Sequence, residues 1–189
     1  ITKGKTWNPV IGYTEVSPGC TNCYAAKMEW RLADIPAMQQ DYWGLTKKLE
    51  NGRIVWTGEV REMPDRLQEP SEIKKPTVWF VDSMSDLFHK DVSWKFIYKV
   101  FERMLLTPWH TYQVLTKRAN RLHILADIIL HLQRNYPDHV FLLKNVWIGV
   151  SVKKQKGSNN RRERLKQVAA EGWLTWVSNE PCLSHIDWS

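Results

Sequence analysis

The residues of this chain that most clearly suggest chemistry are Cys20 and Cys23, which are separated by two residues. Two thiolates at this spacing can bind one metal ion or one corner of an iron–sulfur cluster. The same spacing also occurs in redox-active pairs and in cysteines that only pack in a core. Three cysteines in 189 residues do not make a secreted disulfide framework, so we expect no structural disulfide.

The segment around these cysteines is typical of a loop that leads into a helix. Pro18 and Gly19 turn the chain just before Cys20, which lets the loop wrap around a bound centre. The pattern predicts a helix over residues 22–34. The free N–H groups at the start of such a helix can also bind an anionic ligand.

Beyond this loop, apolar runs that are typical of strands alternate with amphipathic segments. The sequence predicts strands over 77–81, 111–115, 145–150 and 173–177, and helices over 93–106, 120–135 and 161–171. Residues 53–57 are a candidate fifth strand, and residues 35–52 are expected to form loop. This alternation predicts an α/β fold with a parallel sheet and right-handed crossover helices. Because closure takes about eight strands, we expect an open sheet.

Polar or charged residues follow each of the four clear strands. They are Asp82 and Ser83, Thr116 and Lys117, Ser151, and Asn179 and Glu180. In parallel α/β folds ligands bind at the carboxyl ends of the strands, so we expect one site there, with the cysteine loop docked on the same side. Helix capping and turns are the alternative, and they account for Ser85 and Ser93 better than for Lys117 and Glu180.

Composition narrows the class of protein. The net charge is +7 and the pI is about 9.3, which suits a polyanionic partner but also a merely basic protein. Eleven tryptophans can fill a core or stack on bases. No apolar run reaches the roughly 18 residues of a membrane span, and no signal peptide is evident, so we expect a cytoplasmic protein without a membrane partner.

Five motifs together resemble a phage-borne three-cysteine-motif family of unassigned function, whose members look like radical S-adenosylmethionine enzymes and share a general likeness with spore photoproduct lyase. The motifs are residues 7–9 with 17–25, Ser83-Met84-Ser85-Asp86-Leu87-Phe88-His89, Leu115-Thr116-Lys117-Arg118, residues 146–152, and Glu180-Pro181. They occur in the family's order along nearly the whole chain, so residues 1–189 are expected to form one domain.

The resemblance implies a partial TIM barrel that holds a [4Fe–4S] cluster on three cysteines. Its fourth iron would bind the amino and carboxylate groups of S-adenosylmethionine. Carried over, Cys20 and Cys23 would be cluster ligands, and Lys117 and Glu180 would be catalytic. The residues expected to contact the cofactor are Tyr24, Ser83, Asp86, Ser151, Asn179 and Glu180.

The chain departs from the family pattern at several positions. Tyr13, which six intervening residues separate from Cys20, stands where the family has its first cysteine, and a phenol is a poor iron ligand at neutral pH. Cys182 is the only other cysteine. Lys153 and Lys154 replace an acidic residue. Members of the family continue beyond the position of Ser189 with a further strand and a glycine-rich segment, so we expect this chain to be truncated at its C-terminal end.

Three hypotheses follow. The first is a radical S-adenosylmethionine-like iron–sulfur protein that acts on a nucleic acid or nucleotide, degenerate at Tyr13 and an enzyme only if the cluster forms. The second is an inactive module on the same fold that binds nucleic acid or a partner protein. The third is a zinc protein that uses Cys20, Cys23 and a histidine such as His89.

Overall fold

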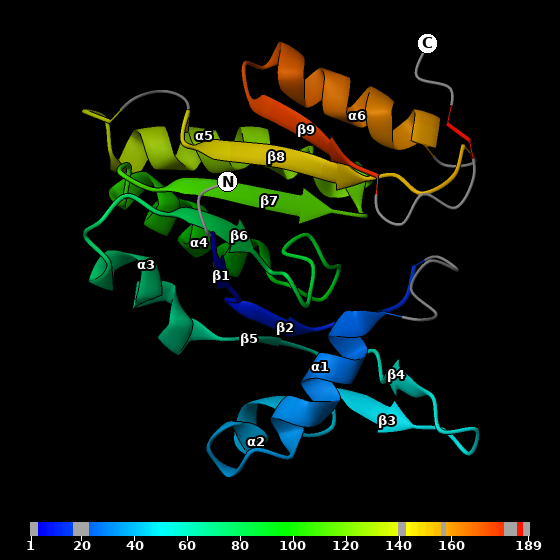
Figure 1. Ribbon diagram of the computed structural model, residues 1–189. Helices are drawn as coiled ribbons and strands as arrows, with labels where there is room; N and C mark the ends of the chain where they lie inside the picture. The colour runs from blue at the N-terminus through cyan, green and yellow to red at the C-terminus, as the bar shows by residue number, and fades with distance from the viewer. Residues whose placement is uncertain (1–3, 17–22, 140–142, 156–157, 180–184, 187–189) are drawn as a thin grey trace.

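The computed structural model describes residues 4–16, 23–139, 143–155, 158–179 and 185–186. In these residues the main element is a parallel sheet of five strands, in the order β1-β6-β7-β8-β9 (Figure 1). The strands are β1 (Lys5–Trp7), β6 (Val78–Val81), β7 (Thr111–Thr116), β8 (Val146–Ser151) and β9 (Leu174–Ser178). Three helices connect the last four strands: α4 (Trp94–Leu106), α5 (Ile124–Asn135) and α6 (Ser158–Ala170). Strands β1 and β9 are its free edges, so the described residues form no closed barrel.

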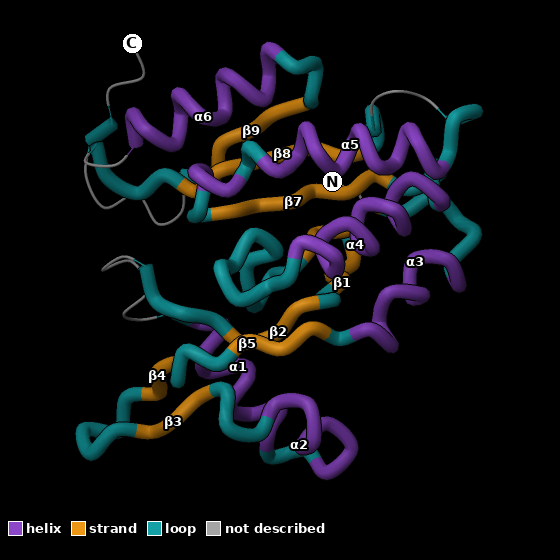
Figure 2. The backbone as a smooth tube through the Cα atoms, turned by 180° about the vertical axis from the view of Figure 1, so that it is seen from behind, coloured by secondary structure: helices purple, strands orange, loops and turns teal. Residues whose placement is uncertain are grey.

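These three helices lie on one face of the sheet, behind the strands in Figure 1 and in front of them in Figure 2. The residues of β8 that point to this face, Val146, Ile148 and Val150, are fully buried. Helix α4 covers the sheet with an apolar stripe at helical spacing: Phe96, Ile97, Val100, Phe101, Met104 and Leu105. Its start is fixed by Ser93, whose Oγ accepts the N–H of Phe96 at 3.2 Å.

A smaller module lies below the carboxyl end of β1 in Figure 1. Strand β2 (Val10–Gly12) pairs antiparallel with β5 (Val60–Glu62), and β3 (Thr46–Lys48) pairs antiparallel with β4 (Ile54–Trp56). Helix α1 (Tyr24–Ala33) packs against β3 and β4, and α2 (Pro36–Tyr42) packs against α1. A hydrophobic cluster of its own includes Ile11, Tyr13, Ala25, Tyr42 and Trp56. Short helical turns follow: Pro64–Gln68, α3 (Glu69–Glu72) and, before α5, Ala119–Arg121.

Two expectations for residues 35–57 are wrong. Residues 53–57 do not join the parallel sheet, because β4 folds back on β3 through a hairpin in which Gly52 adopts a φ of +80°. The fifth strand of the sheet is β1, which pairs with β6 across more than 70 residues. Residues 35–52 are not loop throughout, because α2 starts with Pro36 at its first position, where a missing N–H costs nothing.

The other predicted strands and helices agree with the structure to within a few residues at their ends, whereas β2, β5 and α3 were not predicted. Among the described residues, no helix is both long and apolar enough to cross a bilayer.

Candidate functional site

The turns after the parallel strands meet at one edge of the sheet, the carboxyl edge. Asp82, Ser83 and Asp86 follow β6, and Lys117 follows β7. Ser151 ends β8 and pairs in register with Ser178 near the end of β9. Since neighbouring strands are parallel, their carboxyl ends lie at the same edge of the sheet.

Asp86 organises this edge. It is 2% exposed, and its Oδ1 accepts the hydroxyl of Thr116 at 2.8 Å and the N–H of Phe88 at 3.0 Å. Its Oδ2 accepts the N–H of Lys117 at 3.1 Å and the guanidinium of Arg118 at 3.0 Å. Both oxygens therefore have protein donors, and Asp86 ties the turn after β6 to the end of β7.

Two cations lie against the ring of Tyr13. The amine of Lys117 is 5.0 Å and the guanidinium carbon of Arg118 is 4.9 Å from the ring centroid, within the range of cation–π contacts. Arg118 also donates to the carbonyl of Thr14 at 3.0 Å. The phenol is 4% exposed, and its ring packs against Trp56 with centroids 5.8 Å apart. Tyr13 is thus a packed core residue that joins the small module to the end of β7.

The start of α1 reaches the same edge. Cys23 precedes the helix and packs, half-buried, against the cluster that contains Tyr13 and Met84. The hydroxyl of Tyr24 donates to the carbonyl of Ser83 at 3.3 Å. This contact places the beginning of α1 beside the turn after β6. Cys20 and Glu180, expected as cluster ligand and catalytic residue, lie outside the described residues.

The segment after β1 supports the turn after β6. The amide oxygen of Asn8 accepts the N–H and the hydroxyl of Ser83 at 2.9 and 3.1 Å. The N–H of Val10 donates to Oδ1 of Asp82 at 3.0 Å, and Asp82 adopts a φ of +55°, which is uncommon outside glycine. Oδ2 of Asp82 is buried without a partner, and burial raises the pKa of this carboxyl well above its usual range.

Ser151 and Asn179 lie at the other end of this edge. The carbonyl of Ser151 accepts the guanidinium of Arg161, which holds the start of α6 against β8. Oδ1 of Asn179 is buried without a partner. In the described part of the chain, no hydrogen bond joins either residue to Asp86 or Lys117.

His89 is not positioned as a metal ligand. Its Nε2 lies 2.9 Å from the hydroxyl of Thr14, and its Nδ1 accepts the N–H of Asp91 at 3.2 Å. The side chain is buried, and burial lowers the pKa of the imidazole. Within the described ranges, no group of three or more His, Cys, Asp and Glu residues could hold a metal ion.

Sequence reasoning did not assign roles to Asn8 or Arg118, which hold this edge together. Asn8 stands in the Trp7-Asn8-Pro9 motif and Arg118 directly follows Lys117, so both lie in segments that had already attracted attention. Nothing local to these residues shows that Asn8 supports Ser83 or that Arg118 pairs with Asp86, because both partners are distant in the sequence.

The fold and the edge define a parallel α/β protein with a polar, partly cationic carboxyl edge, beside which lie Cys23 and the start of α1. The chain belongs to a family of proteins of unknown function (DUF5131), whose model matches residues 2–189. No curated protein and no solved structure matches the chain.

Proposed function

We propose that this chain is a radical S-adenosylmethionine-like domain that binds a nucleotide or nucleic acid at the carboxyl edge, and that it binds this ligand without a complete cluster site. The family motifs, the parallel sheet with its crossover helices and the position of Cys23 beside the edge support the first part. An open, partial barrel is the finer form of the fold that we propose, with β1 and β9 as its free edges.

The single observation that carries the proposal is the packing of Tyr13. A [4Fe–4S] cluster that leaves one iron open for a chelating cofactor needs three thiolates. At the first of these positions the chain has a phenol that is 4% exposed and lies against two cations and an indole. The described residues around position 13 therefore do not fit a three-thiolate cluster, and we derive no reaction step through one.

Lys117 is the residue best placed to bind an anion at this edge. Its backbone is fixed by Asp86 and its amine rests over Tyr13. Among the described carboxylates, none lies within ion-pair distance of this amine, whereas the neighbouring Arg118 is neutralised by Asp86 at 3.0 Å. Lys117 therefore keeps its charge available for a phosphate. Asn8 and Asp86 act as positioning residues.

The catalytic form of the hypothesis requires a replacement for the missing thiolate. In that form Ser83, Asp86, Ser151 and Asn179 would contact the cofactor, together with Tyr24 and Glu180. The protein donors that already occupy both oxygens of Asp86 favour a supporting role for this residue. The zinc alternative would need ligands other than His89, whose two nitrogens already have protein partners.

Two measurements test the proposal. Iron and sulfide per chain after anaerobic reconstitution should be well below one cluster. Binding of ATP, followed by calorimetry, should weaken about 10-fold in Lys117→Ala, because a hydrogen bond to a charged group is lost. The matched control is Lys48→Ala, an exposed cation on β3, which should bind ATP as the parent does. A full cluster in the parent, or equal ATP binding in both variants, would overturn the proposal.

A further inference from the structure

One face of the parallel sheet has no described helix over it, as the two opposite views show (Figures 1 and 2). Alternate residues of β6 to β9 point to this face and keep part of their surface exposed: Phe80, Gln113, Leu115, Trp147, Leu174 and Trp176. Parallel sheets normally have both faces covered. A half-exposed apolar face on such a sheet is therefore a surface for a ligand or partner.

Two aromatic side chains reach toward each other across this face. Phe80 lies on β6 and Trp176 on β9, three strands apart, which corresponds to about 14 Å at the usual spacing of strands. Their ring centroids are nevertheless only 6.4 Å apart. The indole of Trp176 lies over Gly149 of β8, where an added Cβ would come within 2.4 Å of the ring. The absence of a side chain at Gly149 lets this indole cross the face.

Trp147 is the exposed platform on this surface. It is 37% exposed, and it pairs in register with Gln113 on one side and Leu174 on the other. Leu174 is itself 52% exposed, so the surface on that side of Trp147 is also open to solvent at Leu174. A flat indole in this setting can stack on a nucleobase, and such stacking tolerates any base because every base has a π face.

The ends of β8 carry only positive charge. Exposed Lys144 precedes the strand, exposed Lys154 follows it, and residues 143–155 contain no aspartate or glutamate. The six residues of β8 span about 20 Å. A polyanion laid along the strand would therefore meet a cation at each end and an aromatic platform between them, and charge complementarity favours this occupant over an apolar protein surface.

We propose that β8 and its neighbours form a track for single-stranded nucleic acid, in which an unpaired base stacks on Trp147 and phosphates contact Lys144 and Lys154. The inference rests on the proposed function and specifies its ligand class. A duplex does not fit, because its bases stack on one another and offer no free face to an indole.

The test is fluorescence anisotropy with a labelled oligothymidylate of about 12 nucleotides, compared with about 4 nucleotides and with a labelled duplex. The longer single strand should bind best and the duplex least. Trp147→Ala should weaken binding about 10-fold, because stacking on one aromatic ring contributes that much, whereas Trp147→Phe should restore most of it. The control Trp43→Ala removes an indole that is 65% exposed on the small module, and it should leave binding unchanged.

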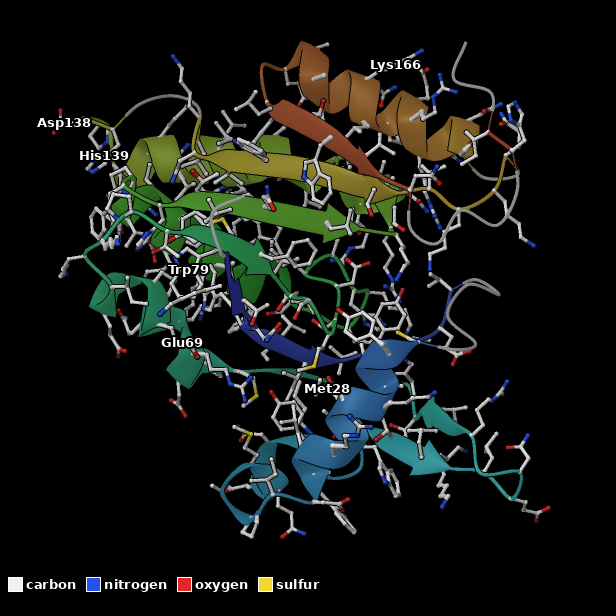
Figure 3. The ribbon with its side chains drawn as sticks, in the orientation of Figure 1. Met28, Glu69, Trp79, Asp138, His139 and Lys166 are labelled. Carbon is white, nitrogen blue, oxygen red and sulfur yellow. The ribbon has the colours of Figure 1, made fainter. Side chains whose placement is uncertain are left out.

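The cations are tested by salt dependence. Replacing Lys144 and Lys154 together by alanine should make the slope of log affinity against log salt shallower by about 1.4, since each phosphate contact on a single strand contributes about 0.7. Replacing Lys48 and Lys166 together removes the same charge. Lys48 lies on β3, and Lys166 lies on the outer side of α6 (Figure 3), so this pair should leave the slope unchanged.

Several outcomes would overturn the inference. Duplex binding as tight as single-strand binding would do so, as would unchanged binding by folded Trp147→Ala. A dimer seen by light scattering and broken by Trp147→Ala would show that a second copy covers the face. If ATP still binds in a Lys117-dependent manner in these cases, only the track is refuted. If ATP and oligonucleotides both fail to bind, the proposed function falls as well.

Discussion

Oε1 of Glu29 accepts the backbone N–H of Gly12 at 3.2 Å, which joins α1 to β2 inside the small module. Glu29 is fully buried, and its Oε2 has no hydrogen-bond partner. Burial raises the pKa of this carboxyl from 4.5 to about 8, although the Gly12 N–H and the charge of Arg66 act in the opposite direction. At neutral pH the group is therefore mainly protonated in the folded protein.

The first prediction concerns pH. Because the folded-state pKa is raised, the stability that Glu29 contributes is fully present below the unfolded value of 4.5 and is lost as pH rises through about 8. Glu29→Gln keeps an acceptor for Gly12 but cannot ionise. Between pH 5 and pH 9 the free energy of unfolding of the parent should therefore fall by roughly 4 kcal/mol relative to that of this variant. Denaturant unfolding at several pH values measures this difference. As a control, Glu50→Gln removes an exposed carboxyl, and its free energy of unfolding should depend on pH in the same way as that of the parent. Parallel curves for Glu29→Gln would show that Glu29 does not titrate in this range.

The second prediction concerns the ion pair of Asp86 and Arg118. Both side chains are largely buried, at 3% and 13% exposure. Asp86→Asn leaves the guanidinium without its counter-charge and should lower the free energy of unfolding by about 3 kcal/mol. Asp91→Asn breaks the exposed pair with Lys90 and should change the free energy of unfolding far less than Asp86→Asn does, because water screens the exposed pair. A double-mutant cycle with Arg118→Gln measures the interaction free energy between Asp86 and Arg118. A value near zero would contradict the proposed role of Asp86.

The third prediction concerns Tyr13. Tyr13→Cys removes a buried ring from its contacts with Trp56, Lys117 and Arg118, so it should lower stability by about 2–4 kcal/mol. It also places a thiol at the position where the proposed cluster site would need its first cysteine. Iron and sulfide per chain after anaerobic reconstitution should therefore rise. Tyr13→Phe keeps the ring and should change neither stability nor iron content by much. No gain of iron in Tyr13→Cys would show that the loop no longer supports a cluster.

The fourth prediction concerns Gly149. An added methyl group meets the indole of Trp176 at 2.4 Å, so Gly149→Ala should cost about 1–3 kcal/mol through overpacking. In a Trp176→Leu background the obstacle is gone, and the same substitution should cost much less. Thermal unfolding of the four proteins in this cycle gives the coupling between the two positions. If the effects of the two substitutions on stability are additive, the cost of Gly149→Ala comes from the β8 strand itself and not from contact with the indole.

Local sequence was sufficient for the elements whose signal lies within one segment. Strands β6 to β9 could be predicted because each is a short run rich in β-branched and aromatic residues and is bounded by turn residues. Helix α4 is specified by its stripe and by Ser93, which caps it within one turn. Polar residues at the strand ends also indicated the carboxyl edge, since parallel order alone brings Asp86 and Lys117 together.

The tertiary structure decided what depends on distant partners. Residues 5–7 and 54–56 are both short extended segments, and only pairing distinguishes them: β1 joins β6 across the chain, while β4 closes on β3 next to it. In the same way, the resemblance to a three-cysteine motif predicts only that position 13 is a ligand position, whereas the fold shows the Tyr13 ring packed against Lys117 and Arg118. Burial and ion pairing are properties of residues that meet in space, and so the sequence of one segment cannot determine them.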